Sequence, residues 1–149
     1  PEPVQQVLVP TGGGGLAAGI ALACPEASIF CVEPEGWDDM GWSLEAGEIV
    51  PVSADAPPTL CDALQTPKVS PITFGILHAR GATGISVNED ETKAAVRLAY
   101  ENLGLVVEAG GAVALAALLA GKAPIGPGTV AVLSGGNIDP ELHSQIVAG

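Results

Sequence analysis

The sequence predicts an α/β fold of three layers, in which a mostly parallel β-sheet carries helices on both of its faces. One observation behind this prediction is that short apolar, β-branched runs alternate with helical patterns along the 149 residues. A second is that glycine-rich or polar turns follow the apolar runs, at 12–15, 110–111 and 134–137. Because ligands bind at the carboxyl ends of strands in open α/β sheets, we expect these turns to meet at one edge.

Four predicted strands are apolar runs that end at turn residues, and they cover residues 4–10, 28–34, 84–87 and 129–134. The last of these runs is apolar without interruption, which predicts a central place in the sheet. A further short strand is expected at 48–52. The sequence contains no internal repeat and no low-complexity linker, so residues 1–149 are expected to form a single domain.

Predicted helices alternate with these strands. The clearest helix begins after Asn88, whose side chain can form a capping box with Glu91, and it ends at Gly104. An alanine-rich stretch predicts a buried helix, since the helix it would form is apolar on all sides. The other helices are expected at 16–24, at about 111–120 for the alanine-rich stretch, and at 140–148.

Composition excludes several classes of protein. The formal net charge is −12, from 17 acidic against five basic residues, and such a surface repels phosphate backbones, so we expect no nucleic-acid partner. No apolar run is long enough to span a membrane, and residues 1–3 (PEP) lack the basic start of a signal peptide. Cys24, Cys31 and Cys61 form no CxxC pair, which favours reduced thiols in a cytoplasmic protein.

Four consecutive glycines stand at 12–15 in the stretch VLVPTGGGGLAAGIALA, between a predicted strand and a predicted helix. A glycine loop at the start of a helix binds phosphate, because backbone N–H groups point at one spot and no side chain blocks the anion. A P-loop would need Gly-Lys-Ser/Thr after the glycines, and Leu16-Ala17 stands there instead. A merely tight turn is the plain alternative.

A dinucleotide-binding loop is another interpretation of the same residues. Gly12, Gly14 and Ala17 fit the pattern GxGxxA, and Glu33 follows 21 residues after Gly12, near where an acid that binds ribose belongs. On these residues alone, a Rossmann domain of a nicotinamide-dependent oxidoreductase stays open.

Four segments, in the order VPTGGGGLAAG, VEPEGWDD, VVEAGGAVALAAL and VLSGGNID, extend the comparison over residues 4–139. Together they resemble the fold type II pyridoxal-phosphate enzymes, and among these the serine/threonine dehydratases (threonine ammonia-lyases) and the related serine racemases. The resemblance implies pyridoxal 5′-phosphate as the cofactor and an amino acid as the substrate. It also implies that the chain is the C-terminal part of the large domain of that fold, and it suggests a homodimer.

The resemblance implies a role for each matched residue. The cofactor's phosphate would be held by the glycine loop and by the amide of Leu16. The Ser134 hydroxyl would meet the pyridine nitrogen, where a neutral group makes the ring a weaker electron sink than a carboxylate does. Glu108 would lie close to the ring, beside a turn completed by Gly136. The implied cofactor residues are Gly12, Gly13, Gly14, Gly15, Leu16, Glu108, Ser134, Gly135 and Asn137.

The segment EPEGWDD places four carboxylates within seven residues. Crowded carboxylates repel one another unless a cation joins them, and hard oxygen ligands suit Mg²⁺ or Ca²⁺. The residues alone favour a solvated acidic loop. The resemblance adds the expectation of a divalent-cation site, Mg²⁺ or Ca²⁺, with Glu33, the backbone carbonyl of Trp37, and Asp39 as ligands.

Pyridoxal-phosphate chemistry needs a lysine that holds the cofactor as a Schiff base and moves the α-proton. In the resembling enzymes this lysine lies in the N-terminal half, and Lys68, Lys93 and Lys122 all lack its context. We therefore predict no catalytic residue in this chain, and we expect the N-terminal part with the Schiff-base lysine, and the small domain, to be absent from residues 1–149. The isolated chain is expected to be inactive.

The predicted function is that of the cofactor-binding half of a serine/threonine-type dehydratase, which deaminates a β-hydroxy amino acid to an oxo acid and ammonia. A racemase of the same family, a nicotinamide-dinucleotide-binding oxidoreductase domain and a lysine-less binding module are the alternatives. Two departures from the family pattern, Ala63 in place of Gly and Ala109 in place of Pro, leave the preferred substrate open.

Overall fold

The computed structural model describes residues 2–149. Pro1, which belongs to the segment at 1–3 noted above, lies outside the described residues. One short 3-10 helix, η1, occurs between the second and third α-helices. In chain order the elements are β1 (Gln6–Pro10), α1 (Gly15–Ala23), β2 (Ser28–Pro34), α2 (Asp39–Ala46), η1 (Asp62–Leu64), α3 (Pro71–Ala79), β3 (Thr83–Val87), α4 (Glu89–Leu103), α5 (Ala109–Leu119), β4 (Thr129–Ala131) and α6 (Pro140–Ala148).

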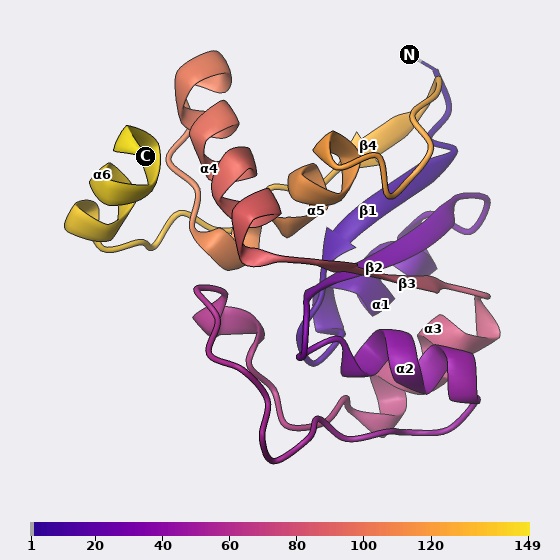
Figure 1. Cartoon of the computed structure of the whole chain (residues 1–149). Helices are drawn as coiled ribbons and strands as arrows, with labels where there is room; N and C mark the ends of the chain where they lie inside the picture. The colour runs from indigo at the N-terminus through magenta and orange to yellow at the C-terminus, as the bar shows by residue number, and fades with distance from the viewer. Residues whose placement is uncertain (1) are drawn as a thin grey trace.

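The strands of the described residues form one parallel sheet in the order β3-β2-β1-β4. Gln6 of β1 lies beside Ser28 of β2 on one side and beside Thr129 of β4 on the other. Phe30 of β2 in turn lies beside Thr83 of β3. Since all the strands run in one direction, their carboxyl ends share one edge of the sheet, and the loops that follow them leave from that edge (Figure 1).

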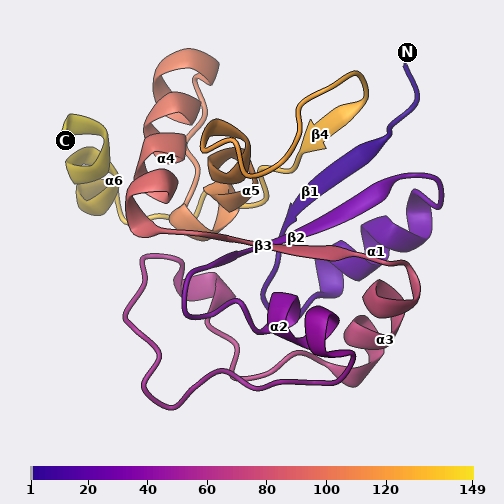
Figure 2. The same cartoon turned by 45° about the vertical axis from the view of Figure 1, so that its right-hand side comes forward.

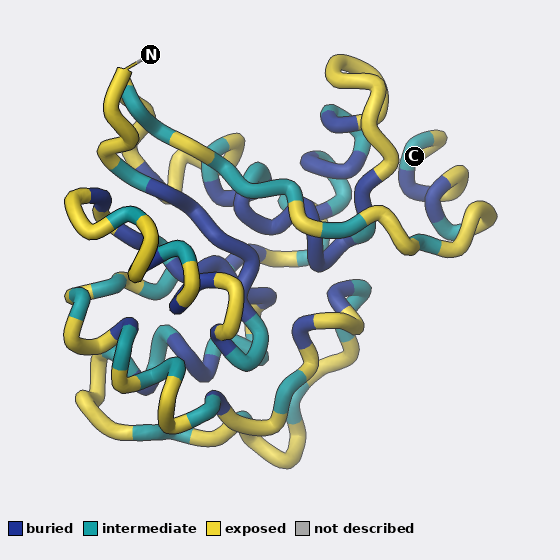
Figure 3. The backbone as a smooth tube through the Cα atoms, turned by 180° about the vertical axis from the view of Figure 1, so that it is seen from behind, coloured by how far each residue is buried: buried dark blue, intermediate teal, exposed yellow. Residues whose placement is uncertain are grey.

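Helices cover both faces of this sheet. Figure 2 shows α4, α5 and α6 on one side of the strands and α1, α2 and α3 on the other. Each side has its own buried apolar cluster, and β1 contributes to both, with Leu8 facing one and Val7 and Val9 facing the other. Seen from behind, the two central strands β1 and β2 are largely buried (Figure 3), whereas β3 and β4 at the two edges are more exposed. The predicted three-layer α/β architecture is confirmed.

Two helices show why the sequence pattern worked locally. Asn88 Oδ1 accepts from the Glu91 N–H, and Glu91 Oε2 accepts from the Asn88 N–H, both at 2.9 Å, so the capping box of α4 is confirmed. Gly104 ends this helix with a φ of 67°. The alanine-rich α5 is buried on nearly all sides between α4 and the sheet. No helix within residues 2–149 combines the length and the apolar character needed to cross a membrane.

Three local predictions are wrong. Residues 48–52 form no strand, and the Val50 N–H donates to the Ser43 hydroxyl of α2 at 2.9 Å instead of to a neighbouring strand. The strand predicted at 129–134 is only Thr129–Ala131, and among the described strands it lies at the edge of the sheet instead of in the centre. Gly110 and Gly111 do not form a turn, because α5 already begins at Ala109.

Candidate cofactor site

The glycine loop follows β1 and is held by neighbours on both sides. The Thr11 N–H donates to the Val32 carbonyl of β2 at 2.9 Å, and the Thr73 hydroxyl of α3 donates to the Gly13 carbonyl at 2.6 Å. Gly14 is the N-cap of α1 and has a φ of 89°, a backbone conformation that is strained for residues with a side chain. The loop therefore brings the unpaired N–H groups of the first turn of α1 to the carboxyl edge of the sheet.

The four glycines differ in what surrounds them. A Cβ at Gly14 would lie 2.6 Å from Met40 Cε and 3.0 Å from Thr73 Cβ, and a Cβ at Gly12 would lie 3.3 Å from Leu64 Cα, so neighbouring residues inside the protein crowd both positions. A Cβ at Gly13 would have its nearest neighbour 4.0 Å away, and a Cβ at Gly15 would meet no described atom within 4 Å. Space is therefore kept open beside the N-terminus of α1, which is what a phosphate group needs in order to reach backbone amides.

The SGGN turn after β4 interlocks with the start of α5. The Glu108 N–H donates to the Gly135 carbonyl at 2.9 Å, and the Ser134 N–H donates to the Gly111 carbonyl at 3.4 Å. A Cβ at Gly135 would lie 2.1 Å from Glu108 Oε1, and a Cβ at Gly136 would lie 2.7 Å from the Val106 carbonyl oxygen. Backbone atoms therefore leave no room for a side chain at Gly136, whereas Gly135 leaves the space that the Glu108 carboxylate occupies.

The glycine loop and the SGGN turn reach the same edge of the sheet. The Val132 N–H donates to the Leu8 carbonyl at 3.0 Å, so the chain after β4 continues alongside β1 toward that edge. Between the glycine loop and the start of α5 lies η1, where Leu64 packs against both Gly12 and Gly110. The structure therefore brings the glycine loop, the segment of Glu108 and the SGGN turn to the same edge of the sheet, although they come from three separate parts of the sequence.

Sequence reasoning missed two residues that shape this region. Thr73 holds the Gly13 carbonyl from 60 positions away in the sequence. Leu64 fills the space between the glycine loop and α5, and it directly follows Ala63, one of the two departures from the family pattern. A Thr in the first turn of a helix and a Leu in a short 3-10 helix are common, so neither position gave a signal of its own.

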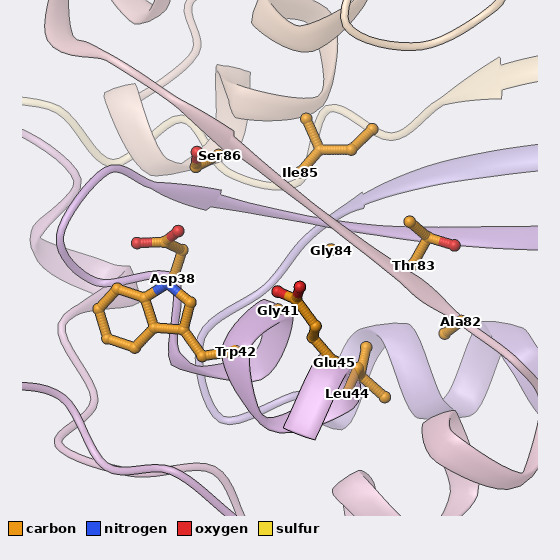
Figure 4. A pocket seen from close by; sticks show the side chains of 10 residues that line it. All are labelled: Asp38, Gly41, Trp42, Leu44, Glu45, Ala82, Thr83, Gly84, Ile85 and Ser86. Atoms are coloured by element: carbon orange, nitrogen blue, oxygen red, sulfur yellow. The ribbon is translucent and has the colours of Figure 1, made fainter. Parts of the chain in front are cut away.

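A separate cavity of about 480 Å³ lies between α2 and β3. In Figure 4, Asp38, Trp42 and Glu45 of the α2 segment lie on one side of it and residues 82–86 lie on the other. Neither the glycine loop nor Ser134 lines this cavity. It is therefore distinct from the candidate cofactor site at the carboxyl edge of the sheet.

The acidic segment is partly buried, so the interpretation as a solvated loop is wrong for two of its carboxylates. The Glu33 side chain is fully buried, and its two oxygens accept from the Met40 and Gly41 N–H groups of α2, each at 2.9 Å. Burial raises the pKa of the Glu33 carboxyl well above its usual range, while the two amides oppose that shift. Glu33 thus stabilises the N-terminus of α2, which begins inside the segment predicted as a loop.

Asp39 is also fully buried, and within residues 2–149 no donor makes a hydrogen bond to either of its carboxylate oxygens. Burial raises the pKa of Asp39 to about 6; the nearby amides of Asp39 and Val69 oppose this shift without reaching hydrogen-bond geometry, and the charge of Asp38 adds to it. Trp37 is held by its indole N–H, which donates to the Pro57 carbonyl at 2.7 Å.

The expected ligands of a cation therefore lie close together in sequence but do not form a cluster of carboxylates. Among the described residues, no group of three or more His, Cys, Asp or Glu side chains is placed to hold a metal ion. The expected cation site has only two carboxylates, those of Glu33 and Asp39, together with the Trp37 carbonyl. It stays a prediction.

The position of Glu33 also disfavours a dinucleotide-binding site. In that interpretation Glu33 presents its carboxylate to a ribose hydroxyl, but the side chain is buried and both of its oxygens already accept from α2. The interlocked SGGN turn has no role in a Rossmann dinucleotide site. The nicotinamide alternative is therefore not favoured.

Comparison with known proteins defines the class. The family model described as "Pyridoxal-phosphate dependent enzyme" matches residues 1–135, and the chain belongs to this family, in its fold type II. Among its relatives, a putative threonine dehydratase of Sinorhizobium fredii is 40% identical over 98% of this chain and 46% of the relative. The L-threonine ammonia-lyase of Geobacter sulfurreducens is 40% identical over 97% of this chain and 37% of the relative.

Solved structures agree with these relatives. The crystal structure of a threonine deaminase from the organism abbreviated T.th. matches 90% of this chain and 50% of its own, with 41% identity and a TM-score of 0.80. The maize serine racemase matches 95% of this chain and 45% of its own, with 30% identity and a TM-score of 0.84. The chain spans less than half the length of the curated relatives it matches.

Proposed function

We propose that this chain is the cofactor-binding part of a pyridoxal-phosphate-dependent dehydratase that deaminates a β-hydroxy amino acid to an oxo acid and ammonia. The observation that carries the proposal is the glycine loop, whose open space at Gly13 and Gly15 faces the N-terminus of α1 at the sheet edge that also carries the SGGN turn. The dehydratase and ammonia-lyase names of the relatives support the reaction class.

The residues of the site divide the work of binding. The amides at Gly13 to Leu16 would bind the phosphate group, since they lie at the positive end of the α1 dipole. The Ser134 hydroxyl would meet the pyridine nitrogen, beside the turn that Gly135, Gly136 and Asn137 form against α5. When bound, pyridoxal phosphate supplies an electron sink for the electron pair left after the α-proton is removed. Glu108, anchored through its amide to Gly135, would order the ring side of the site.

We further propose that the lysine for this reaction belongs to an N-terminal part outside these 149 residues, together with a small domain. The test compares the intact protein with residues 1–149 alone, in assays of oxo acid and ammonia release from L-threonine and L-serine. The intact protein is expected to be active and the chain alone inactive. Turnover by the chain alone would contradict the missing lysine, and D-serine formation without oxo acid would favour a racemase.

A cation at the acidic segment is the finer part of the proposal. The buried, unpartnered oxygens of Asp39 support it, because a divalent cation would supply the charge that no neighbouring donor within residues 2–149 supplies. Glu33, through the lone pairs that its oxygens keep beside the two α2 amides, and the Trp37 carbonyl would complete the set. The melting temperature of the intact protein should rise with Mg²⁺ or Ca²⁺ and fall with a chelator, and D39N should abolish both responses. Equal melting temperatures with cation and with chelator would exclude the site.

A homodimer is supported by an exposed apolar strip. Leu103, Leu105 and Val106 each keep about half of their surface exposed, and they follow one another at the end of α4 and just beyond it. In the intact protein L105E should produce a monomer by light scattering, with the far-ultraviolet circular dichroism unchanged. A dimer that survives this substitution would place the interface elsewhere. The free thiols of Cys24, Cys31 and Cys61 support a cytoplasmic location.

A further inference from the structure

A cavity of about 540 Å³ lies between α4 and α6, away from every residue assigned above to the cofactor. The two helices stand side by side at one end of the molecule (Figures 1 and 2). The walls of the cavity contain positively charged, negatively charged and apolar side chains. The charged residues are Glu89, Asp90, Lys93 and Arg97 of α4, and the apolar wall is formed by Leu60, Leu142 and Ile146.

The charge balance of this cavity differs from that of the chain. The chain has five basic residues against 17 acidic ones, yet two of those five, Lys93 and Arg97, line this one cavity. They are one helical turn apart and therefore lie on the same face of α4. With Glu89 and Asp90 the charged lining comes to two positive and two negative groups. The charged side chains that line the cavity therefore sum to zero, whereas the chain as a whole has a net charge of −12.

Two of the four charged groups are committed to the structure and two are free. Arg97 Nη1 donates to the Ile146 carbonyl at 3.0 Å and so ties α6 to α4. Glu89 Oε1 accepts from the Thr59 hydroxyl at 2.7 Å and from the Leu60 N–H at 3.0 Å, which fixes the Leu60 wall. Within residues 2–149, Lys93 and Asp90 make no hydrogen bond or ion pair through their side chains. One free ammonium and one free carboxylate therefore flank an apolar wall.

We propose that this cavity binds a free α-amino acid with an apolar side chain, at a site separate from the cofactor. Lys93, supported by the remaining donors of Arg97, meets the ligand's carboxylate, and Asp90 meets its ammonium group. The side chain lies against Leu60, Leu142 and Ile146. A multiply charged anion is repelled by Glu89 and Asp90, and a divalent cation is repelled by Lys93 and Arg97, so a zwitterion is the ligand whose two charges both find partners.

The test uses L-valine, which has an apolar side chain and no β-hydroxyl group to lose. Binding to the intact protein is followed by nuclear magnetic resonance, with the amides of α4 and α6 as the reporters. Saturable shifts in these amides are expected with L-valine. Isovalerate, which lacks the ammonium group, and isobutylamine, which lacks the carboxylate, should each bind at least about tenfold more weakly, because each leaves one charged wall unpaired.

Two substitutions distinguish a zwitterion from a simple ion. K93Q and D90N should each weaken L-valine binding by about tenfold, whereas an anion site would be strengthened by D90N and a cation site by K93Q. K68Q, the same change at a lysine outside the cavity, is the matched control and should leave the affinity unchanged. The proposal is overturned if α4 and α6 show no saturable shifts, if shifts occur only at the glycine loop, or if the two variants change affinity in opposite directions.

Discussion

Glu108 and Gly135 are in contact through both main chain and side chain: the Glu108 N–H donates to the Gly135 carbonyl at 2.9 Å, and a Cβ on Gly135 would lie 2.1 Å from Glu108 Oε1. This contact joins the turn that carries Ser134 to the helix that begins with Ala109. The geometry of the ring side of the proposed site therefore depends on a glycine at position 135.

G135A tests that dependence. The atom in the way is the end of a flexible side chain, so the Glu108 carboxylate can move aside at little cost in folding free energy. The moved carboxylate no longer orders the site, and we expect the activity of the intact protein to fall at least about tenfold while the melting temperature changes little. Unchanged activity would show that the position of Glu108 is not needed.

G111A should have the opposite profile. A Cβ at Gly111 would lie 2.7 Å from the Gly135 carbonyl oxygen and 2.8 Å from its nitrogen, and these backbone atoms cannot rotate away. We expect a loss of about 1–3 kcal/mol in the free energy of unfolding, as for an overpacked core. G19A on α1 is the control, because no described atom lies within 4 Å of its added Cβ; it should be neutral or stabilising by up to about 1 kcal/mol. Denaturant unfolding curves decide between these outcomes.

Gly84 and Gly41 provide a second, one-sided contact, where α2 crosses β3. A Cβ at Gly84 would lie 2.3 Å from Gly41 Cα, whereas a Cβ at Gly41 would lie 3.4 Å from Gly84 Cα. G84A should therefore cost about 2–3 kcal/mol of folding free energy. G41A touches the same place from the other side and should cost under about 1 kcal/mol, since alanine also favours the helix. Equal losses in the two variants would contradict the packing described.

The cysteines should differ in reactivity. Burial raises the pKa of the Cys31 thiol to about 12, with the charge of Glu33 adding to it, and burial raises the pKa of the Cys61 thiol to about 11. At pH 8 neither forms the reactive thiolate, so a thiol reagent should label half-buried Cys24 alone in the folded protein and all three after unfolding. Mass spectrometry of the labelled protein gives the count, and fast labelling of Cys31 would contradict its burial.

The same shift predicts a loss of stability in alkali. A thiol whose folded pKa is raised favours the folded state fully below its usual value near 9, and this contribution is lost as pH rises toward 12. Between pH 8 and pH 10.5 Cys31 should contribute a loss of about 2 kcal/mol, which C31A removes. Unfolding curves of the two proteins at both pH values measure the difference, and parallel losses in the two would exclude Cys31 as the cause.

The sequence predicted the parts of this structure whose causes are local. The capping box of α4 involves residues three positions apart, and the glycine loop and the SGGN turn are continuous motifs. Residues joined over long distances were not predictable in this way. The Thr73 hydroxyl reaches Gly13 across 60 positions, and Glu33 turns a cluster of acids into the start of α2 through hydrogen bonds that no local pattern reveals.

Errors in the strands have a similar origin. The apolar run at 129–134 has the composition of a central strand, but its pairing with β1 extends only from Thr129 to one last hydrogen bond of Val132 with Leu8. The Ser134 N–H then donates to Gly111 of α5, so the end of the run forms the turn toward Glu108. Residues 48–52 have a strand-like composition as well, yet the Val50 N–H finds its partner in a serine side chain of α2. Composition indicates which segments can form a strand, but a strand forms only where another strand is close enough to accept its backbone hydrogen bonds.

Pyridoxal phosphate binding by G15L in the intact protein is the most direct test of the central claim, that the glycine loop is the phosphate site. No described atom lies within 4 Å of a Cβ at Gly15, so the fold should tolerate the side chain, which would occupy the space that the phosphate needs. G19L, one turn further along α1 and equally unobstructed, is the matched control. We expect G15L to weaken cofactor binding at least about tenfold and G19L to leave it unchanged. Equal cofactor affinity in G15L and the unmodified protein would contradict the account.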